Sequence, residues 1–249
     1  MTTVIETTAL WVPKKGSADA EWEGAWAVGE GRLSFAVADG ASSSYRAGEW
    51  ASLLVERFAS EPPLRFGVAE FAEWVDGVAG DFQDRSEQEA EDDQWYVADA
   101  SLRGSFATFA GIHFHPTDPD GRWRAIVVGD TCLCHVRDDE LLGCAPKERS
   151  GDFDSTPDLL MSQAGPAGRG ADAAMLVEGS SRTDDVFLLM TDALAAYALA
   201  AEERGAPVWR SLIASTSAGF ERAVTRLRER EAMDDDDVTM LRCRVRAIG

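Results

Sequence analysis

The sequence predicts an α+β fold built on antiparallel β-sheets. Apolar runs of strand length follow one another across short turns, which is typical of hairpins rather than of parallel sheets. Segments with helical periodicity form two separate blocks and do not alternate with the strands one by one. No linker and no internal repeat divides the 249 residues, so we expect residues 1–249 to form a single domain.

The first half of the chain reads as strands interrupted by a pair of helices. Strands are expected at residues 2–12, 25–28, 33–38, 105–115 and 122–128. Residues 46–60 carry bulky apolar side chains four positions apart, which indicates a helix that ends before Pro62-Pro63. A second helix is indicated by the apolar stripe of Phe71, Trp74, Val75, Val78 and Phe82. Its acidic end and the loop after it take up residues 84–94.

The second half combines hairpin strands with a C-terminal pair of helices. Strands are expected at residues 131–137, 140–145, 185–191 and 238–245, and helices at 193–203 and 208–231. Between them, residues 146–184 are rich in Gly, Ser, Asp and Pro, and we expect a long functional or mobile loop there.

The composition excludes several classes of partner. Asp and Glu number 44 against 24 Lys and Arg, and a net charge of −20 repels a nucleic-acid backbone. No apolar run reaches the roughly 20 residues that span a bilayer, and no secretory signal is visible, so no membrane partner is expected. The four cysteines lack the spacing of a zinc site, and Cys132 and Cys134 share one face of a strand. We therefore expect a reduced, cytoplasmic, monomeric protein.

Acidic side chains stand at the ends of the predicted strands. The set comprises Glu23, Asp39, Asp130, Asp192 and one of Asp235, Asp236 and Asp237, with Asp236 favoured. A single acid of this kind is an ordinary turn residue. Several that converge repel one another unless cations lie between them. Because no matching set of His or Cys accompanies these oxygen ligands, Mg²⁺ or Mn²⁺ is favoured over zinc.

Short motifs around these acids resemble those of the metal-dependent protein serine/threonine phosphatases of type 2C, in their bacterial single-domain form. In family order they are Ala38-Asp39-Gly40 with Gly48-Glu49, Gly104–Thr108, Val128–Thr131, Thr191–Leu194 and Asp235–Thr239. Each motif is weak alone, but together they cover about residues 20–245 in the right order. The resemblance implies two stacked antiparallel sheets flanked by helices, an α/β/β/α four-layer sandwich with two metal ions at one end.

The resemblance also implies a reaction and roles for the acids. A water shared by two Mn²⁺ or Mg²⁺ ions would be acidified to hydroxide and would hydrolyse phosphoserine or phosphothreonine in a protein. Asp39 would bridge the ions, and Gly40 would offer its carbonyl to one of them. Asp192 and Asp236 would hold the first ion and, like Asp39, count as catalytic. Glu23 would reach the second ion, and Asp130 a weak third one. The implied partners are a phosphorylated protein substrate and a cognate serine/threonine kinase.

Several positions depart from the family pattern. Asp19 stands where a phosphate-binding arginine is usual, and Gly24 replaces an acid after Glu23; Ala41, Ala193 and Ala196 replace a histidine, a glycine and an acid. These departures keep open a pseudophosphatase, which would bind a phosphoprotein or kinase without hydrolysis. A third alternative is a non-catalytic acidic scaffold. His113 and His115 share a strand face, but no third ligand is near in sequence, so a solvent-facing pair is favoured over a metal site.

Overall fold

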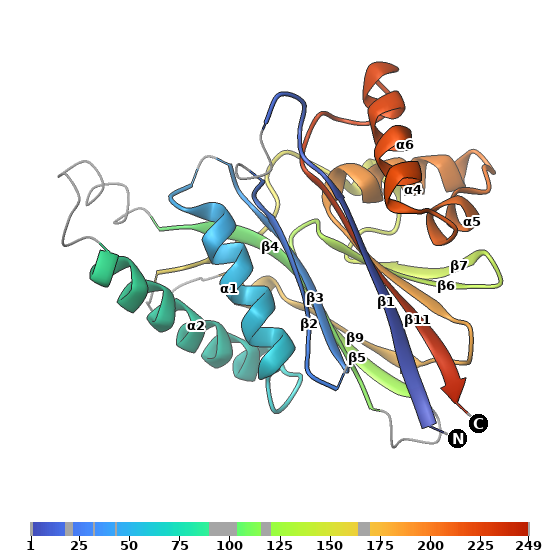
Figure 1. Ribbon diagram of the computed structural model, residues 1–249. Coiled ribbons are helices and arrows are strands. Elements are labelled where there is room, and N and C mark those ends of the chain that lie inside the picture. Colours follow the sequence, from blue (N-terminus) through green and yellow to red (C-terminus); the bar gives the residue numbers. More distant parts are fainter. Residues whose placement is uncertain are drawn as a thin grey trace.

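Two antiparallel β-sheets pack face to face, and helices cover the outer face of each (Figure 1). The structure is a computed structural model that describes residues 2–17, 22–31, 33–42, 44–89, 104–115, 121–163 and 170–248. This is the four-layer α/β/β/α arrangement expected from the resemblance, and the α+β class is confirmed.

The two sheets are built from strands of both halves of the chain. Sheet A has the order β1 (Thr2–Val12), β11 (Val238–Ile248), β10 (Val186–Met190), β6 (Cys132–Arg137) and β7 (Glu140–Ala145). Sheet B has the order β2 (Gly24–Val28), β3 (Ser34–Gly40), β4 (Phe106–Phe114), β5 (Arg122–Val128) and β9 (Met175–Ser180), and β8 (Leu160–Met161) pairs with β4. The N-terminal and C-terminal strands therefore lie side by side, in register from Thr2 opposite Ile248 to Val12 opposite Val238.

Helices cover the sheets in two groups. Helices α1 (Ala47–Ser60) and α2 (Val68–Glu89) lie over sheet B, and α4 (Asp192–Glu203), α5 (Val208–Ile213) and α6 (Ser217–Glu229) lie over sheet A (Figure 1). Short 3₁₀ turns occupy Ser150–Asp152 and Ala171–Ala173. In the described part of the chain, no helix is both long enough and apolar enough to cross a membrane.

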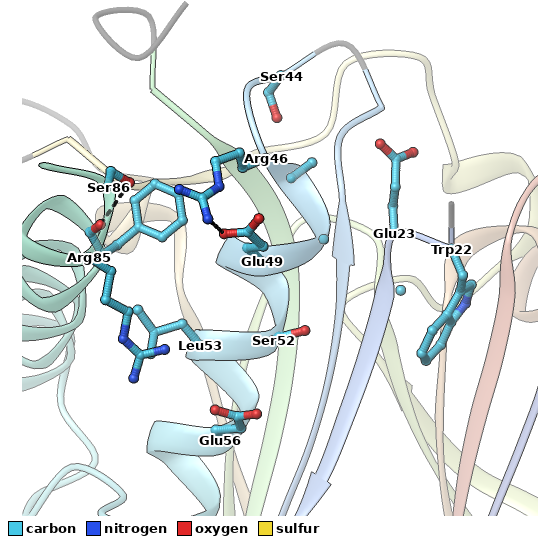
Figure 2. Close-up of a pocket in the computed structure, with 14 residues that line it drawn as sticks. Trp22, Glu23, Ser44, Arg46, Glu49, Ser52, Leu53, Glu56, Arg85 and Ser86 are labelled. Atoms are coloured by element: carbon cyan, nitrogen blue, oxygen red, sulfur yellow. Dashed lines mark hydrogen bonds and ion pairs between the residues drawn. The ribbon is translucent and has the colours of Figure 1, made fainter. Parts of the chain in front are cut away.

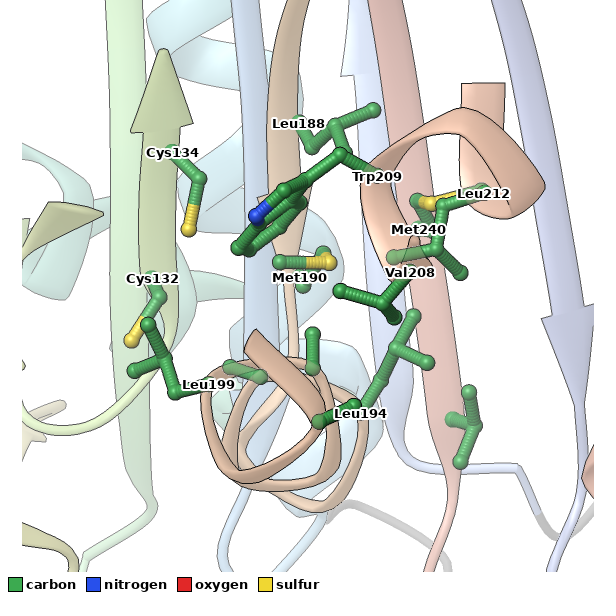
Figure 3. Close-up of a cluster of buried hydrophobic side chains, with 14 of the residues drawn as sticks. Cys132, Cys134, Leu188, Met190, Leu194, Leu199, Val208, Trp209, Leu212 and Met240 are labelled. Carbon is green, nitrogen blue, oxygen red and sulfur yellow. The ribbon is translucent and has the colours of Figure 1, made fainter. Parts of the chain in front are cut away.

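The hydrophobic side chains form three layers. Between the sheets, Phe35 and Val37 of β3 pack with Phe187 of β10. The alternate side chains of the same strands point outward, because successive residues of a strand face opposite sides of a sheet. Thus Ala36 and Ala38 meet α1, while Leu188 and Met190 meet the helices over sheet A (Figure 3). Strands buried on both faces read as unbroken apolar runs, which is why the acids that end them stood out in the sequence.

Two strands in the predicted 146–184 loop were missed from the sequence, the two-residue β8 (Leu160–Met161) and β9. Residues 175–180, MLVEGS, fall in the predicted 146–184 loop but form β9, which pairs with β5 at the edge of sheet B. Met175 and Leu176 are exposed, and Glu178 and Gly179 weaken the strand signal. An edge strand with a largely exposed side carries too little apolar pattern to be recognised locally.

The structure has two helices where the sequence predicts one long C-terminal helix. The expected helix 208–231 is interrupted after Ile213, and α6 begins again at Ser217. The Thr216 hydroxyl accepts a hydrogen bond from the Gly219 amide at 3.3 Å and so caps the new helix. A Ser or Thr just before a helix favours its start, because the side-chain oxygen accepts a hydrogen bond from a free backbone amide of the first turn.

The expectation of fully reduced cysteines is wrong for one pair. Cys134 on β6 and Cys144 on β7 lie opposite each other and form a disulfide, with a Cα–Cα distance of 4.0 Å. Cys132 and Cys243 are free and buried. The partnership depends on the hairpin register, which the spacing of Cys132 and Cys134 along one strand does not reveal. The cytoplasmic location, which rested partly on reduced cysteines, stays a prediction.

Candidate active site

Hydrogen bonds bring the ends of four strands together at one end of the sandwich. The Gly40 amide at the end of β3 donates to the Glu23 carbonyl just before β2, at 3.2 Å. Across the sandwich, the Thr191 amide after β10 donates to the Thr239 carbonyl of β11 at 3.1 Å. The Thr191 hydroxyl donates to the Asp237 carbonyl at 3.2 Å. Residues far apart in the sequence are thereby fixed around one point.

A pocket of about 330 Å³ lies at this point. Its acidic lining consists of Glu23, Asp39, Asp130, Asp154, Asp192, Asp236 and Asp237. Gly40, Ala41, Ser42 and Thr108 also line it. All six site residues expected from the sequence, Gly40 included, therefore border one cavity. Asp154 was missed, because it lies in the long loop, where acids are common and no strand end marks them.

Asp39 is the carboxylate with the least support from hydrogen bonds. No described residue donates a hydrogen bond to its side chain. Its pKa is raised well above the ordinary value, first because burial removes the carboxylate from water and then because Asp192 and Asp236 repel its charge. A desolvated carboxylate in this setting needs a proton or a cation.

Asp192 and Asp130 face the same cavity from sheet A and from the β5–β6 turn. Asp192 opens helix α4, and its carboxylate accepts a hydrogen bond from the Ala193 amide at 2.6 Å. Burial and the charge of Asp130 raise the pKa of Asp192 to about 7. The pKa of the buried Asp130 is also raised, chiefly by burial; its own amide and the charge of Lys147 act in the opposite direction.

The structure separates the roles within the run Asp235–Asp237. The Asp237 carboxylate is buried and accepts the Lys14 amide at 2.8 Å and the Glu23 amide at 2.9 Å, so it serves as a clamp between segments. Asp235 is exposed and accepts the Lys15 amide at 3.0 Å. Asp236 borders the pocket, and among the described residues its carboxylate accepts a hydrogen bond from the neighbouring Asp237 amide alone, at 2.8 Å. Asp236 was favoured in the sequence as the metal ligand of this run, and that role stays a prediction.

Glu23 differs from the other pocket acids because a lysine already pairs with it. The Lys14 ammonium lies 3.4 Å from the Glu23 carboxylate and 3.3 Å from the Ser42 hydroxyl. The Ser42 hydroxyl also donates to Glu23. Burial works against the charge of Lys14, but Glu23 and then Asp237 outweigh it, so the pKa of Lys14 is raised.

Two glycines at the site are required by close packing. A Cβ at position 40 would lie 2.7 Å from the Ala47 carbonyl oxygen, because the first turn of α1 sits directly on the end of β3. A Cβ at position 24 would lie 2.7 Å from the Thr239 hydroxyl and 2.9 Å from the Trp22 indole nitrogen. The absence of an acid at position 24 is therefore built into the contact between the two sheets.

A second groove of about 610 Å³ adjoins the acidic pocket. It runs between α1, α2 and the start of β2, and Glu23 borders both cavities (Figure 2). Arg46 pairs with Glu49 on its floor, and Arg85 lies at its α2 side (Figure 2). The groove thus continues the acidic pocket across a surface of mixed charge.

The comparison with protein families decides the identity of this arrangement. The family described as Protein phosphatase 2C matches residues 19–231.

The chain belongs to the protein phosphatase 2C family.

Solved structures show the same fold for the phosphatase. The catalytic domain of the serine/threonine protein phosphatase PstP, in complex with two manganese ions, matches with 19% identity and a TM-score of 0.66, covering 99% of this chain and 100% of that one. PstP/Ppp of Mycobacterium tuberculosis matches with 18% identity and a TM-score of 0.65, covering 98% and 99%. PppA, a regulatory component of the T6SS in Pseudomonas aeruginosa, matches with 18% identity and a TM-score of 0.60, covering 99% of each chain. No curated protein matches.

The family places this phosphatase among the protein serine/threonine phosphatases, a metal-dependent class. Within the described ranges, no three His, Cys, Asp or Glu side chains stand close enough to form a ready-made metal site. The donor set nevertheless fits divalent cations. It consists of hard carboxylate oxygens around one cavity, and no described residue donates a hydrogen bond to the Asp39 carboxylate among them.

The departures from the family pattern fall at identifiable places. Ala41 borders the pocket and offers no proton donor, while the neighbouring Ser42 is held by Glu23. Ala196 lies on α4 and does not border the pocket, so it supplies no carboxylate beside Asp130. The charges that act on Asp130 include those of Lys147, Asp154 and Asp236. Asp19 lies outside the described residues.

The histidine pair stands apart from this site. The rings of His113 and His115 on the β4 side lie 4.9 Å apart, and His113 shares a hydrogen bond of 2.9 Å with Ser34. Burial, and then the neighbouring His115, lower the pKa of His113. Among the described residues they belong to no group of three or more possible metal ligands.

Proposed function

We propose that this phosphatase hydrolyses phosphoserine and phosphothreonine in proteins with the help of two Mn²⁺ or Mg²⁺ ions. The observation that carries the proposal is the state of Asp39. Its carboxylate is partly buried, lacks a hydrogen-bond donor among the described residues, and borders the same pocket as Asp192 and Asp236; burial and the charges of these two acids raise its pKa. Cations bound between these carboxylates would neutralise their charges and relieve their mutual repulsion.

The proposed division of labour follows from the contacts. Asp39 would be shared between the ions, with Asp192 and Asp236 on one side and Glu23 on the other. When bound, the ions would supply an acidified water at neutral pH and positive charge for the phosphoryl oxygens. Asp237 accepts hydrogen bonds from the backbone amides of Lys14 and Glu23, and Thr191 links β10 to β11. These hydrogen bonds would fix the positions of the proposed ligands. Asp130 with Asp154 would form at most a weak third site.

The substrate is expected to be a phosphorylated protein, paired with a cognate serine/threonine kinase. We place the residues that flank the phosphorylated side chain in the groove between α1 and α2, because that groove opens beside Glu23 (Figure 2). We also propose that residues 1–249 act as one domain, as a monomer, in the cytoplasm.

Hydrolysis by metal-stripped protein tests the proposal. Release of phosphate from an aryl phosphate and from phosphoserine and phosphothreonine peptides is followed with Mn²⁺, with Mg²⁺ and with EDTA. We expect turnover only with added ions and loss of turnover in Asp39→Asn. Hydrolysis that is unaffected by EDTA would contradict the metal-dependent assignment.

A pseudophosphatase is the second candidate, and two observations favour it. Position 24 cannot hold an acid without displacing Trp22 or Thr239, and the Glu23 carboxylate is already paired with Lys14. The same experiment separates the candidates when melting is followed in parallel. Stabilisation by Mn²⁺ without hydrolysis would indicate a pseudophosphatase, and neither effect would indicate an acidic scaffold.

A further inference from the structure

Lys14 is fixed at the rim of the acidic pocket by its backbone. The Lys14 amide donates to Asp237 at 2.8 Å, and the Arg228 guanidinium donates to the Pro13 carbonyl at 2.7 Å. The segment that follows β1 is therefore tied to the loop before β11. Because the backbone is held, only rotation of its own side chain moves the ammonium toward or away from Glu23.

The Lys14 ammonium lies beside a carboxylate of the acidic pocket. It contacts the Glu23 carboxylate at 3.4 Å and the Ser42 hydroxyl at 3.3 Å, and its side chain is only 33% exposed. Among the pocket carboxylates of the described chain, Glu23 alone has a lysine or arginine within ion-pair distance. Arg46, on the α1 side of Glu23, is paired with Glu49 (Figure 2).

We propose that Lys14 is a built-in counter-ion for Glu23 that competes with a divalent cation for this carboxylate and thereby sets the affinity of the Glu23 side of the metal centre. The proposal rests on the metal centre of the proposed function. A cation bound to Glu23 and an ammonium bound to the same carboxylate would lie only a few ångströms apart and repel each other. The ammonium must therefore turn away before the cation binds fully.

The competition predicts that removing the Lys14 charge raises the affinity for Mn²⁺. Removing a positive charge that merely supports a site weakens the site, whereas removing a competing charge strengthens it. Lys14→Met keeps an unbranched side chain that is one atom shorter and deletes its charge. We expect the weaker Mn²⁺ site of this variant to bind about tenfold more tightly than in the wild type, because a unit charge beside a divalent ion is removed. Lys14→Arg should stay near the wild type.

Lys15→Met is the matched control. It changes the net charge by the same amount one residue away, but the Lys15 side chain makes no ion pair or hydrogen bond with a described residue, and its amide donates to Asp235. Long-range electrostatics should therefore be equal in the two variants, and only the contact with Glu23 differs. Melting curves of the metal-free variants show whether both fold as the wild type does.

Calorimetric titration of metal-stripped protein with Mn²⁺ at 0.15 M NaCl, together with aryl phosphate hydrolysis, tests the proposal. Selective tightening in Lys14→Met, absent in Lys15→Met and abolished when Glu23→Gln is added, supports it. Equal effects of the two lysine variants, weaker binding in Lys14→Met, tightening in Lys14→Arg, or no Mn²⁺ binding by the wild type would overturn it. Selective tightening without any hydrolysis would leave the inference standing and refute the proposed function.

Discussion

At the scale of single residues, the Asp39 carboxylate is the acid of the pocket whose charge is most opposed by burial and by neighbouring acids. We expect Asp39→Asn to reduce Mn²⁺-dependent hydrolysis at least about 100-fold, because an amide cannot supply the charge that two cations share. In the metal-free protein the same change should raise the melting temperature, since it removes a desolvated charge that neighbouring acids repel. Kinetics and melting of the variant, beside the exposed Asp172→Asn as control, check both effects. Full activity in Asp39→Asn would refute its role.

Asp192 and Asp130 distinguish the main metal centre from an optional third site. Asp192→Ala should abolish activity at every Mn²⁺ concentration, because the side chain faces Asp39 directly in the pocket. Asp130→Ala should mainly raise the Mn²⁺ concentration required, by about tenfold. Activity of both variants across a Mn²⁺ titration decides the matter. Equal loss at saturating Mn²⁺ would show that the division is wrong.

Gly24 shows a departure from the family that substitution cannot simply reverse. We expect Gly24→Asp to lower the free energy of unfolding by about 1–3 kcal/mol, because its Cβ would collide with Thr239 and Trp22. It should not improve Mn²⁺ binding. Gly24→Ala tests the steric part alone, and denaturant unfolding with Mn²⁺ titration measures both. A stable Gly24→Asp variant that binds Mn²⁺ more tightly would contradict this account.

At the scale of elements, a buried ion network ties β6 to the start of β10. Asp185 is 1% exposed and receives Arg137 at 2.7 Å, His135 at 2.8 Å and the Arg182 amide at 2.8 Å. Burial opposes the charged form, but these donors outweigh it, and the pKa of Asp185 is lowered below 3.8. The network lies away from the acidic pocket, so its role is structural.

Asp185→Asn should therefore cost about 3 kcal/mol of unfolding free energy at neutral pH. Because the folded pKa lies below the unfolded one, the contribution of Asp185 is fully present above pH 3.8 and is lost as the pH falls through the folded pKa. The difference between wild type and variant should shrink over that acidic range. Asp184→Asn, an exposed neighbour, is the control and should cost less than about 1 kcal/mol. Equal losses in the two variants would contradict the prediction.

Element prediction succeeded where the local pattern and the burial agreed. The buried strands β3, β5 and β10 and helix α1 were found within two residues of their ends. Strand β9 was missed because its stability comes from pairing with β5 rather than from its own apolar side chains. The break between α5 and α6 depends on a Thr216 cap that competes with continued helix, and the apolar period alone did not show it.

At the scale of the whole molecule, we expect cation binding to raise the free energy of unfolding, because the chain carries an excess of negative charge. Ions that bind only the folded form at 100 times their dissociation constant stabilise it by about 2.7 kcal/mol. For a chain of this size that corresponds to a rise of about 5–10 °C in melting temperature. Melting with and without millimolar Mn²⁺ measures it. NaCl at matched ionic strength is needed as a control, because salt screens the net charge of −20. An unchanged midpoint in Mn²⁺ would count against any metal site.

The sequence by itself determined which side chains are available for chemistry. Buried strands that end on an acid are visible locally, because an unbroken apolar run and the charge after it are adjacent in the chain. Glu23, Asp39, Asp130, Asp192 and the run before β11 could be named in this way. The strand and helix patterns predicted the α+β class, and the resemblance to the type 2C phosphatases implied the layered arrangement.

Only the tertiary structure shows which of those side chains are already engaged by other residues. The choice of Asp236 as the free carboxylate depends on the Lys14 and Glu23 amides that engage Asp237 from more than 200 positions away. The pairing of Lys14 with Glu23, the tight packing around Gly24 and the disulfide Cys134–Cys144 likewise depend on register and contact. Such relations arise when strands distant in sequence are brought side by side, and no local pattern encodes the distance between them.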